Sequence, residues 1–329
     1  MWRLTGGFIL LAVLLTVGWI FMPKFWSKAP GDFASDRDGP KPAPFDAKRA
    51  MGYLEAICKI GPRISGSEGM KKQQELLKKH FEEHGAAVEL QTFMARQKSQ
   101  SKPVEMANLI AKWHPDLKRR VILCAHYDTR PIADQEPDRR KWYEPFVSAN
   151  DGGSGVALLM ELAHHMKDLK TAVGVDFVLF DGEEYIFNPA EPERGGDRYF
   201  FGSDHFANTY RKEKPKYQYI AAILMDMIGG KGAQFPIEQN SKFKAGPLVE
   251  EIWKLAAELK CTAFRKEDGR DVLDDHIALN RVGIPAIDII DFDYKHWHRL
   301  SDVPANCSGE SLEQVARVLS VWLQKLKDK

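Results

Sequence analysis

The 329-residue chain is predicted to fold as a single three-layer α/β/α domain with a mostly parallel mixed central sheet, preceded by an N-terminal membrane-anchor helix. Apolar strand-like runs alternate with amphipathic segments of ten or more residues, a pattern typical of a parallel sheet that helices cover on both faces. Neither an internal repeat nor a second domain is apparent between residues 45 and 329. A separate uncharged apolar run near the N-terminus predicts the anchor.

The composition is that of an ordinary globular protein, with 44% hydrophobic and 28% charged residues, and 329 residues suffice for one sizeable core. The formal net charge is +1 and no basic stripe is present, which argues against nucleic acid as a partner. The cysteines are scattered and form no C-x-x-C pair, so a thiolate zinc site and a dense disulfide framework are disfavoured, while a single disulfide stays open. They are Cys58, Cys124, Cys261 and Cys307.

Residues 5–22 contain no charged side chain, with Arg3 before them and Lys24 after them. About 17 to 25 such residues cross a bilayer as a helix. Because no clean small-x-small cleavage pattern follows, residues 1–26 are interpreted as an uncleaved signal anchor rather than a removed signal peptide. We expect the domain to lie outside the cytoplasm, periplasmic or extracellular, and to be secreted if the segment is cut. Residues 27–44 have the Pro-, Gly- and Asp-rich composition of a linker.

Within the domain, helices are predicted where apolar residues recur at helical spacing, and strands where short apolar runs end at turn-forming residues. The predicted helices cover residues 46–60, 70–84, 154–169, 247–259, 273–281 and 311–327. The predicted strands cover residues 88–93, 106–113, 120–126, 174–180, 219–225 and 286–290.

The predicted strand at 174–180 leads through Asp181 and Gly182 to two adjacent acids, Glu183 and Glu184. In an open α/β sheet, ligands bind beyond the carboxyl ends of such strands. Two neighbouring carboxylates at that place suit a metal site in which one ligates the cation and the other acts as acid and base. An acidic surface loop is the ordinary alternative for an isolated Glu-Glu pair.

Other segments end in the same kind of residue, which favours the metal site. The strand at 120–126 ends in His126, Asp226 follows the strand at 219–225, Asp151 precedes a helix, and His298 follows the last strand. Acid or imidazole at several strand ends is costly to desolvate without a cation. Mixed histidine and carboxylate ligands without cysteine favour zinc with an open coordination position, the arrangement of catalytic sites.

The motifs AHYDT, SANDGGSGVALLMELA, FDGEE, FGSDHFA, MDMIGG and DDHIALNRVGIPAIDIIDFDYKHWH stand in the order of the M28 zinc peptidase superfamily. Over residues 45–329 the chain most resembles the glutaminyl-peptide cyclotransferases (glutaminyl cyclases) of that superfamily. The resemblance implies a zinc-dependent enzyme with one Zn²⁺ that acts on peptide or protein N-termini. It implies cyclisation of an N-terminal glutamine to pyroglutamate with release of ammonia.

The resemblance also implies roles for individual residues. The implied zinc ligands are Asp151, Glu184 and His298. Glu183 matches the acid/base, Asp226 and Asp274 match acids that hold the substrate amine, and the Trp297 indole matches a donor to the substrate carbonyl. Cyclases place an aromatic residue a few positions after the paired acids, where this chain has Pro189. We therefore expect the substrate pocket to depart from the family pattern more than the metal site does.

Two other interpretations remain. In an M28 aminopeptidase with two zincs, His126 and Asp226 would complete a second metal site, Asp151 would bridge, and Glu183 would activate water. Gly152 favours the cyclase, because dizinc enzymes often carry another acid at that position. A membrane-tethered receptor on an inherited fold is disfavoured by the retention of every ligand. The sequence leaves the oligomeric state open.

Overall fold

The computed structural model describes residues 39–190 and 194–327. The predicted anchor over residues 1–26 and linker residues 27–38 lie outside these ranges, and residues 39–44 form neither helix nor strand. Of the helices in the described part, none combines the length and apolar character needed to span a membrane. Pro40–Lys329 forms one compact unit.

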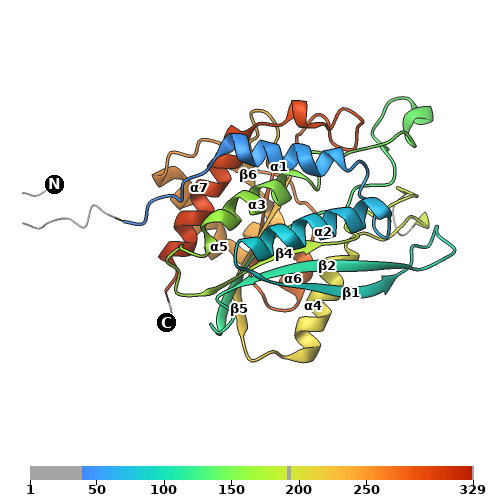
Figure 1. Cartoon of the computed structure of the whole chain (residues 1–329). Helices are drawn as coiled ribbons and strands as arrows, with labels where there is room; N and C mark the ends of the chain where they lie inside the picture. Colours follow the sequence, from blue (N-terminus) through green and yellow to red (C-terminus); the bar gives the residue numbers. More distant parts are fainter. Residues whose placement is uncertain (1–38, 191–193, 328–329) are drawn as a thin grey trace, which may run out of the picture. The chain divides into compact units, whose positions relative to one another are not determined.

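The elements alternate along the chain as predicted (Figure 1). The α-helices are α1 (Ala47–Lys59), α2 (Glu68–Glu83), α3 (Ser154–Met166), α4 (Phe201–Glu213), α5 (Gln239–Glu258), α6 (His276–Arg281) and α7 (Gly309–Lys325). The strands are β1 (Ala87–Ala95), β2 (Val104–Trp113), β3 (Arg119–His126), β4 (Gly174–Phe180), β5 (Gln218–Asp226), β6 (Phe235–Ile237), β7 (Phe264–Asp268) and β8 (Ala286–Ile290). Short 3₁₀ turns are η1 (Arg139–Lys141) and η3 (Pro304–Asn306).

The central sheet has the strand order β1-β2-β4-β3-β5-β8. Its first two pairings, β1 with β2 and β2 with β4, are antiparallel, and the remaining three are parallel. The expected mixed central sheet is therefore confirmed. Because β4, β3, β5 and β8 run in the same direction, their carboxyl ends lie at one edge, and every segment predicted to carry chemistry follows one of these ends or lies beside it.

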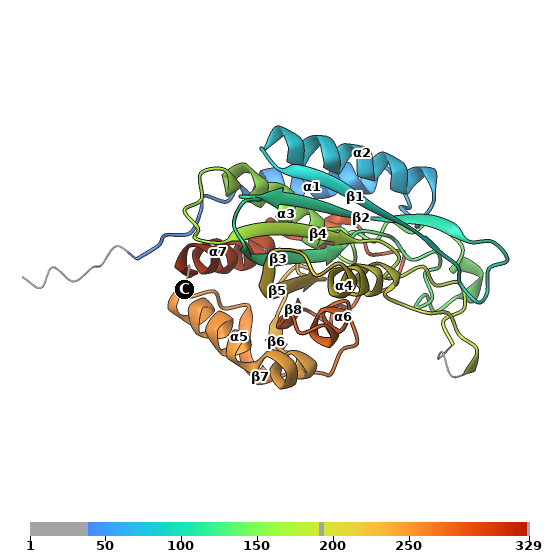
Figure 2. The same ribbon diagram turned by 90° about the horizontal axis from the view of Figure 1, so that it is seen from below.

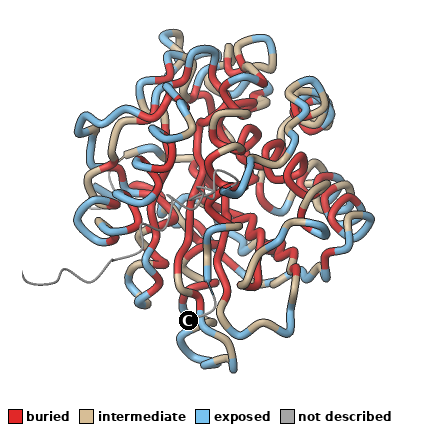
Figure 3. The backbone as a smooth tube through the Cα atoms, turned by 90° about the vertical axis from the view of Figure 1, so that its left-hand side faces the viewer, coloured by how far each residue is buried: buried red, intermediate tan, exposed pale blue. Residues whose placement is uncertain are grey.

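Helices cover both faces of the sheet, with α1, α2, α3 and α7 on one side and α4 and α6 on the other (Figure 2). Both faces must be covered because successive side chains of a strand point to opposite faces, and on β3 they enter two different apolar cores. Val121 and Leu123 pack into the larger apolar cluster under the first set of helices, whereas Ile122 and Cys124 pack into the smaller one under α4 and α6. Burial follows the strands through the middle of the unit (Figure 3). All four cysteines are buried and free.

Three elements were not predicted, namely β6, β7 and α4, and each is short, polar or irregular at its start. Strand β6 has only three residues, strand β7 exposes four of its five, and α4 begins after Phe200 in the left-handed conformation. Helix α5 begins before the predicted residue 247 because two helical segments meet at Ala245, whose φ of −137° is not helical, just ahead of Pro247. Helix α6 is shorter than predicted because Asp274 and Asp275 form the turn that precedes it.

Candidate functional site

The turn after β4 is held in place by the end of the neighbouring strand β3. The backbone N–H groups of Glu183 and Glu184 donate to the two carboxylate oxygens of Asp128, at 3.1 and 3.0 Å. Asp181, at the start of the turn, accepts from the Ser65 hydroxyl at 2.6 Å and from a backbone amide of β2 at 2.8 Å. These bonds fix the direction in which the paired glutamates leave the sheet.

Gly182 and Gly152 are required by this arrangement. Gly182 has a φ of +71°, and a Cβ there would lie 2.6 Å from the Met106 sulfur. Gly152 has a φ of +75°, and a Cβ there would lie 2.6 Å from the Asp128 carbonyl oxygen and 2.9 Å from the His126 ring. L-residues rarely adopt such angles. The position after Asp151 therefore has no room for the second acid that some dizinc enzymes carry there.

Asp151 lies between two imidazoles. Its Oδ1 is 3.0 Å from Nε2 of His126, and its Oδ2 is 3.6 Å from Nε2 of His298. The same His298 nitrogen lies 2.5 Å from Oε1 of Glu184, and the His126 nitrogen lies 3.3 Å from Oδ1 of Asp226. The structure thus brings together the three predicted zinc ligands, and beside them the two residues of the dizinc alternative.

The donor atoms fit a metal ion. One ligand atom from each of His126, Asp151 and Glu184 lies within 4.8 Å of the others, and all three side chains are buried, so this cluster shares two of the predicted ligands and has His126 in place of His298. Asp151 Oδ2 and Glu184 Oε2 are buried oxygens with no hydrogen-bond partner. Buried carboxylate oxygens without partners are costly, and a cation that they coordinate removes that cost. Imidazole and carboxylate donors without thiolate suit zinc.

Asp134 lies against the predicted ligand His298. Its Oδ1 is 3.0 Å from Nδ1 of His298, so the imidazole lies between a carboxylate and the metal-facing oxygens of Glu184. Such a carboxylate orients a ligating histidine and raises its basicity. Arg130 is buried and donates to Asp134 at 2.9 Å, to the Tyr199 hydroxyl at 3.0 Å and to Glu184 at 3.4 Å.

Asp302 holds the backbone at Asp151 in position. Its two carboxylate oxygens accept from the backbone N–H groups of Asn150 and Asp151 at 2.9 and 3.1 Å, and the Tyr294 hydroxyl donates to it at 2.9 Å. The loop that delivers Asp151 is therefore anchored to the segment that follows His298. His298 itself has a φ of +52°, an uncommon backbone conformation for a residue with a side chain and one that clusters at functional sites.

Charges in the site shift several pKa values. Burial alone would raise the pKa of Glu184, but His298 and Arg130 lower it to about 2. Burial and the neighbouring Glu184 charge raise the pKa of Glu183 well above its ordinary value. Burial, with Asp226 and Asp275 nearby, does the same for Asp274. Adjacent glutamates thus differ in character, one suited to ligation and the other to carrying a proton.

The predicted catalytic residues line one cavity of about 530 Å³. Its walls include the acids Glu183, Glu184, Asp226 and Asp274, the predicted ligands Asp151 and His298, and the apolar side chains Tyr199, Phe200, Leu273, Phe292 and Trp297. The Trp297 ring lies 3.9 Å from the His298 ring and 5.2 Å from Phe292, measured between centroids. A few converging polar groups in a largely apolar cavity of this size are typical of a small-molecule site.

His126 lies at the base of this acidic group, 3.8 Å from Glu183 Oε2 through its Nδ1 atom. Pro189 is not among the residues that line the cavity, and aromatic side chains reach it instead from Tyr199 and Phe200, directly before α4. The expected departure of the pocket from the family pattern stays a prediction, and in this chain the aromatic wall comes from the segment directly before α4.

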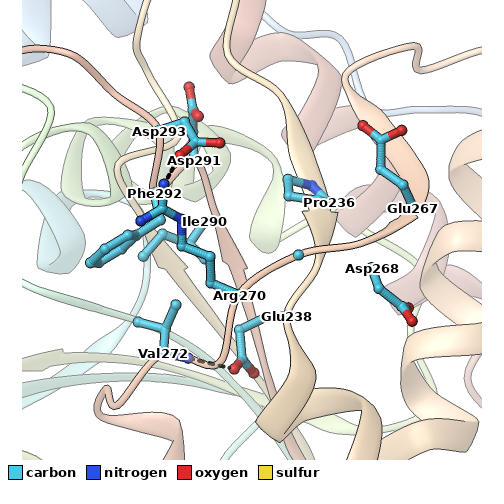
Figure 4. Close-up of a pocket in the computed structure, with 11 residues that line it drawn as sticks. Pro236, Glu238, Glu267, Asp268, Arg270, Val272, Ile290, Asp291, Phe292 and Asp293 are labelled. Atoms are coloured by element: carbon cyan, nitrogen blue, oxygen red, sulfur yellow. Dashed lines mark hydrogen bonds and ion pairs between the residues drawn. The ribbon is translucent and has the colours of Figure 1, made fainter.

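A second pocket of about 440 Å³ adjoins the first and shares Val272, Ile290 and Phe292 with it (Figure 4). It is also acidic, but its acids have ordinary partners. Arg270 pairs with Asp293 at 2.5 Å, and Glu238 accepts from the backbone amide of Val272 at 2.8 Å (Figure 4).

Comparison with known proteins places this geometry in a family. Residues 108–323 match the model for peptidase family M28. The chain belongs to peptidase family M28. Among solved structures, the glutaminyl cyclase of Fimbriiglobus ruber is 54% identical, with a TM-score of 0.86 over 88% of this chain and 98% of that chain. The expected resemblance to the cyclases is confirmed.

Two further relatives show the range of the M28 family. A zinc-dependent exopeptidase from Parabacteroides distasonis is 30% identical, with a TM-score of 0.79 over 86% of this chain and 99% of that chain. The mouse glutaminyl-peptide cyclotransferase-like protein is 25% identical over 307 residues, which cover 84% of this chain and 75% of that protein. The M28 fold is thus shared by cyclases and exopeptidases, and the higher identity lies on the cyclase side.

Sequence reasoning missed Asp134 and Asp302 in this M28 site. Asp134 meets a residue 164 positions away and Asp302 meets one 151 positions away, both through loops. No periodicity connects such positions.

Proposed function

We propose that this chain is a glutaminyl-peptide cyclotransferase, which converts the N-terminal glutamine of a peptide or protein to pyroglutamate and releases ammonia with one Zn²⁺. The observation that carries the proposal is the placement of Glu183 and Trp297 with the three ligand residues in one cavity, in a chain 54% identical to a glutaminyl cyclase. In this assignment Asp151, Glu184 and His298 hold the zinc.

The zinc, when bound, polarises the γ-amide carbonyl of the substrate. Trp297 lies at the wall beside His298, where its indole N–H donates to that carbonyl and orients it. Asp226 and Asp274, which line the same cavity, hold the α-amine. The nucleophile is tethered to the electrophile within one residue, so much of the rate acceleration comes from orientation.

Glu183 moves the proton. The α-amine nitrogen bonds to the amide carbon, Glu183 accepts the proton that this nitrogen loses, and the same carboxyl then gives it to the departing amide nitrogen, which leaves as ammonia. A single group serves as base and then as acid. The raised pKa of Glu183, caused by burial and by Glu184, suits a carboxyl that must hold a proton during the reaction.

A dizinc aminopeptidase is the second candidate, because Asp151 presents one oxygen to His126 and the other to His298. In that case Glu183 would activate water, and the product would be a free amino acid. The lack of room for a side chain at Gly152 and the higher identity to a cyclase favour the first candidate.

The test is incubation of the purified chain and one zinc equivalent with two peptides, one beginning with Gln and one with Leu. Mass spectrometry should find loss of one ammonia from the Gln peptide alone, and Glu183→Gln should abolish it. Release of the first residue, strengthened by a second zinc equivalent, would instead establish the aminopeptidase.

The proposal includes a location, the apolar segment 5–22 serving as a membrane anchor with the catalytic domain outside the cytoplasm. The support is the length and lack of charge of that segment. Membrane fractionation of cells, followed by protease treatment of intact cells, tests it. A chain recovered in the cytosolic fraction would contradict the anchor, and a membrane-bound chain that resists protease would reverse the orientation.

A further inference from the structure

A cluster of three histidines lies away from the catalytic cavity, between helices α2 and α3. His80 and His84 are one turn apart on α2, and His164 is near the end of α3. One ring nitrogen from each lies within 4.8 Å of one from each of the others. The His84 and His164 rings are 4.1 Å apart between centroids, and Nε2 of His84 is 3.1 Å from Nδ1 of His164.

Backbone carbonyls determine which nitrogens carry hydrogen. His80 Nε2 lies 2.8 Å from the Met160 carbonyl oxygen, and His84 Nδ1 lies 2.7 Å from the His80 carbonyl oxygen. A carbonyl can only accept, so these nitrogens are the N–H groups. The lone pairs of the two neutral rings are therefore at His80 Nδ1 and His84 Nε2.

The third ring fits the same pattern. Nε2 of His164 lies 2.6 Å from the Tyr53 hydroxyl, which can accept its hydrogen and leave the lone pair at Nδ1, facing His84. Each imidazole would then have one nitrogen bonded to a protein oxygen and the other turned towards the cluster. That is how metal-ligating histidines are held, since the outer bond fixes both ring orientation and tautomer.

Burial favours the neutral form of His80 and His164, which is the state that binds metal. Burial, with His84 and His164 nearby, lowers the pKa of His80 to about 4, and burial likewise lowers the pKa of His164. The nearby carboxylate Glu161 is occupied by Arg49, through two contacts of 2.6 Å. The available donors are thus imidazoles alone, which suit zinc and neighbouring transition metals rather than calcium or magnesium.

The cluster is separate from the catalytic centre but accessible. His164 is the eleventh residue of α3 and Asp151 precedes the start of that helix, so a rise of 1.5 Å per residue puts about 15 Å of helix between them. His84 and His164 are half-buried, so an ion can reach them from solvent. Figure 1 shows α1, α2 and α3 side by side on this face.

We propose that His80, His84 and His164 form a second zinc site, with water as the fourth ligand, that ties α2 to α3 beside α1. The site is independent of the catalytic zinc and of the proposed reaction, and its effect is on stability.

The test compares the full chain in mild detergent with the double variant His84→Gln/His164→Gln and with His205→Gln as control. His205 is on α4, stacked 4.4 Å from the Phe93 ring. After equilibrium dialysis against buffered zinc, wild type and control should each hold one more zinc per chain than the double variant. Zinc at a hundredfold excess over Kd should raise the Tm of wild type by about 5 °C more than that of the variant.

Equal zinc content in wild type and double variant would overturn the proposal. If the double variant does not fold, wild-type crystals grown with zinc decide the question. An anomalous peak between the three rings supports the site. Its absence, with the catalytic site occupied in the same crystals, overturns it.

Discussion

The two pockets that meet at Val272, Ile290 and Phe292 are both lined by carboxylates, but they differ in what those carboxylates contact. In the catalytic pocket, Asp151 and Glu184 each keep a buried oxygen without a hydrogen-bond partner, and the one on Asp151 lies 3.6 Å from Nε2 of His298. In the neighbouring pocket, whose lining residues all belong to the described part of the chain, no carboxylate oxygen is both buried and unpartnered.

The acids of the neighbouring pocket are satisfied by ordinary means. Asp293 and Asp268 pair with exposed Arg270 and Lys242, and Glu238 accepts backbone amides. The number of acids is thus a poor indicator of a metal centre. A better indicator is a buried carboxylate oxygen that has no hydrogen-bond partner and whose residue contacts an imidazole. Only a cation or a proton can offset the cost of burying such an oxygen.

The largest expected effect is on catalysis, and it distinguishes the role of Glu183 from that of the proposed zinc ligands beside it. Glu183→Gln should lower kcat for ammonia release by about 10²- to 10⁴-fold, because the general base is lost, and should leave zinc content at the wild-type value. Glu184→Gln should lose both. Zinc per chain and ammonia release are measured together, and Asp293→Asn in the neighbouring pocket serves as control with both values unchanged. Loss of zinc from Glu183→Gln would make that residue a ligand.

A smaller effect is expected behind the ligands. Asp134→Asn should weaken zinc binding by about 10- to 100-fold, because His298 loses the carboxylate that orients it. Excess zinc should restore most of the activity. Asp138→Asn is the matched control, since Asp138 lies in the same loop and pairs only with the exposed Arg140. Activity that stays low at saturating zinc would mean that Asp134 acts on the reaction and not on the metal.

The residues of the site differ in how far the sequence could predict them. Those at strand ends were predictable, whereas Asp134, in a loop, was not. His126 and Asp226 end β3 and β5, and Glu184 follows β4; parallel pairing brings the carboxyl ends of such strands together wherever they lie in the chain. The strand pattern therefore predicted which side chains would meet. The parallel strands β3, β4, β5 and β8 were predictable as apolar runs buried on both faces, whereas β1 at the edge of the sheet is mostly exposed.

The supporting residues follow no such rule. Asp302 reaches the amides of Asn150 and Asp151 from a loop, and loop conformation depends on tertiary contacts rather than on residue period. Strand β7 was missed because its sequence, FRKED, is charged and exposed, so it has no apolar alternation. The contacts of His164 were not predicted either, because a helix alone does not reveal which neighbour its side chain meets.

Glu238, in the neighbouring pocket, is expected to stabilise the folded chain rather than to bind a metal. Its side chain accepts from the amides of Asn240, Ser241 and Val272. Although burial raises its pKa, His276 and these amides lower it to about 2. Glu238→Gln should reduce the free energy of unfolding by about 1–3 kcal/mol at pH 7, measured with denaturant, because charge-assisted bonds are lost.

The sign of the pH dependence follows from that lowered value. The folded pKa is below the unfolded one, so the stabilisation is present above about pH 4.5 and is lost as the pH falls towards 2. The deficit of Glu238→Gln should shrink over the same range. Glu267→Gln, at an exposed acid of the same pocket, should change stability by under about 0.5 kcal/mol. A deficit that does not vary with pH would assign the role of Glu238 to packing.

Asp291 gives the smallest effect and the opposite sign. Burial raises its pKa to about 6, although the amides of Gln234 and Asp293 lower it. Because the folded pKa is above the unfolded one, the ionised form opposes folding, and stability falls as the pH rises from about 4 to 6. Asp291→Asn should therefore raise the Tm at pH 8, by a change worth under about 1 kcal/mol after solvent screening, and leave it unchanged at pH 4. Asp293→Asn, at an exposed acid, should show no such difference between the two pH values. If Asp291→Asn is instead less stable than wild type at pH 8, a favourable partner stabilises the Asp291 carboxylate. The ionised form of Asp291 would then support folding rather than oppose it.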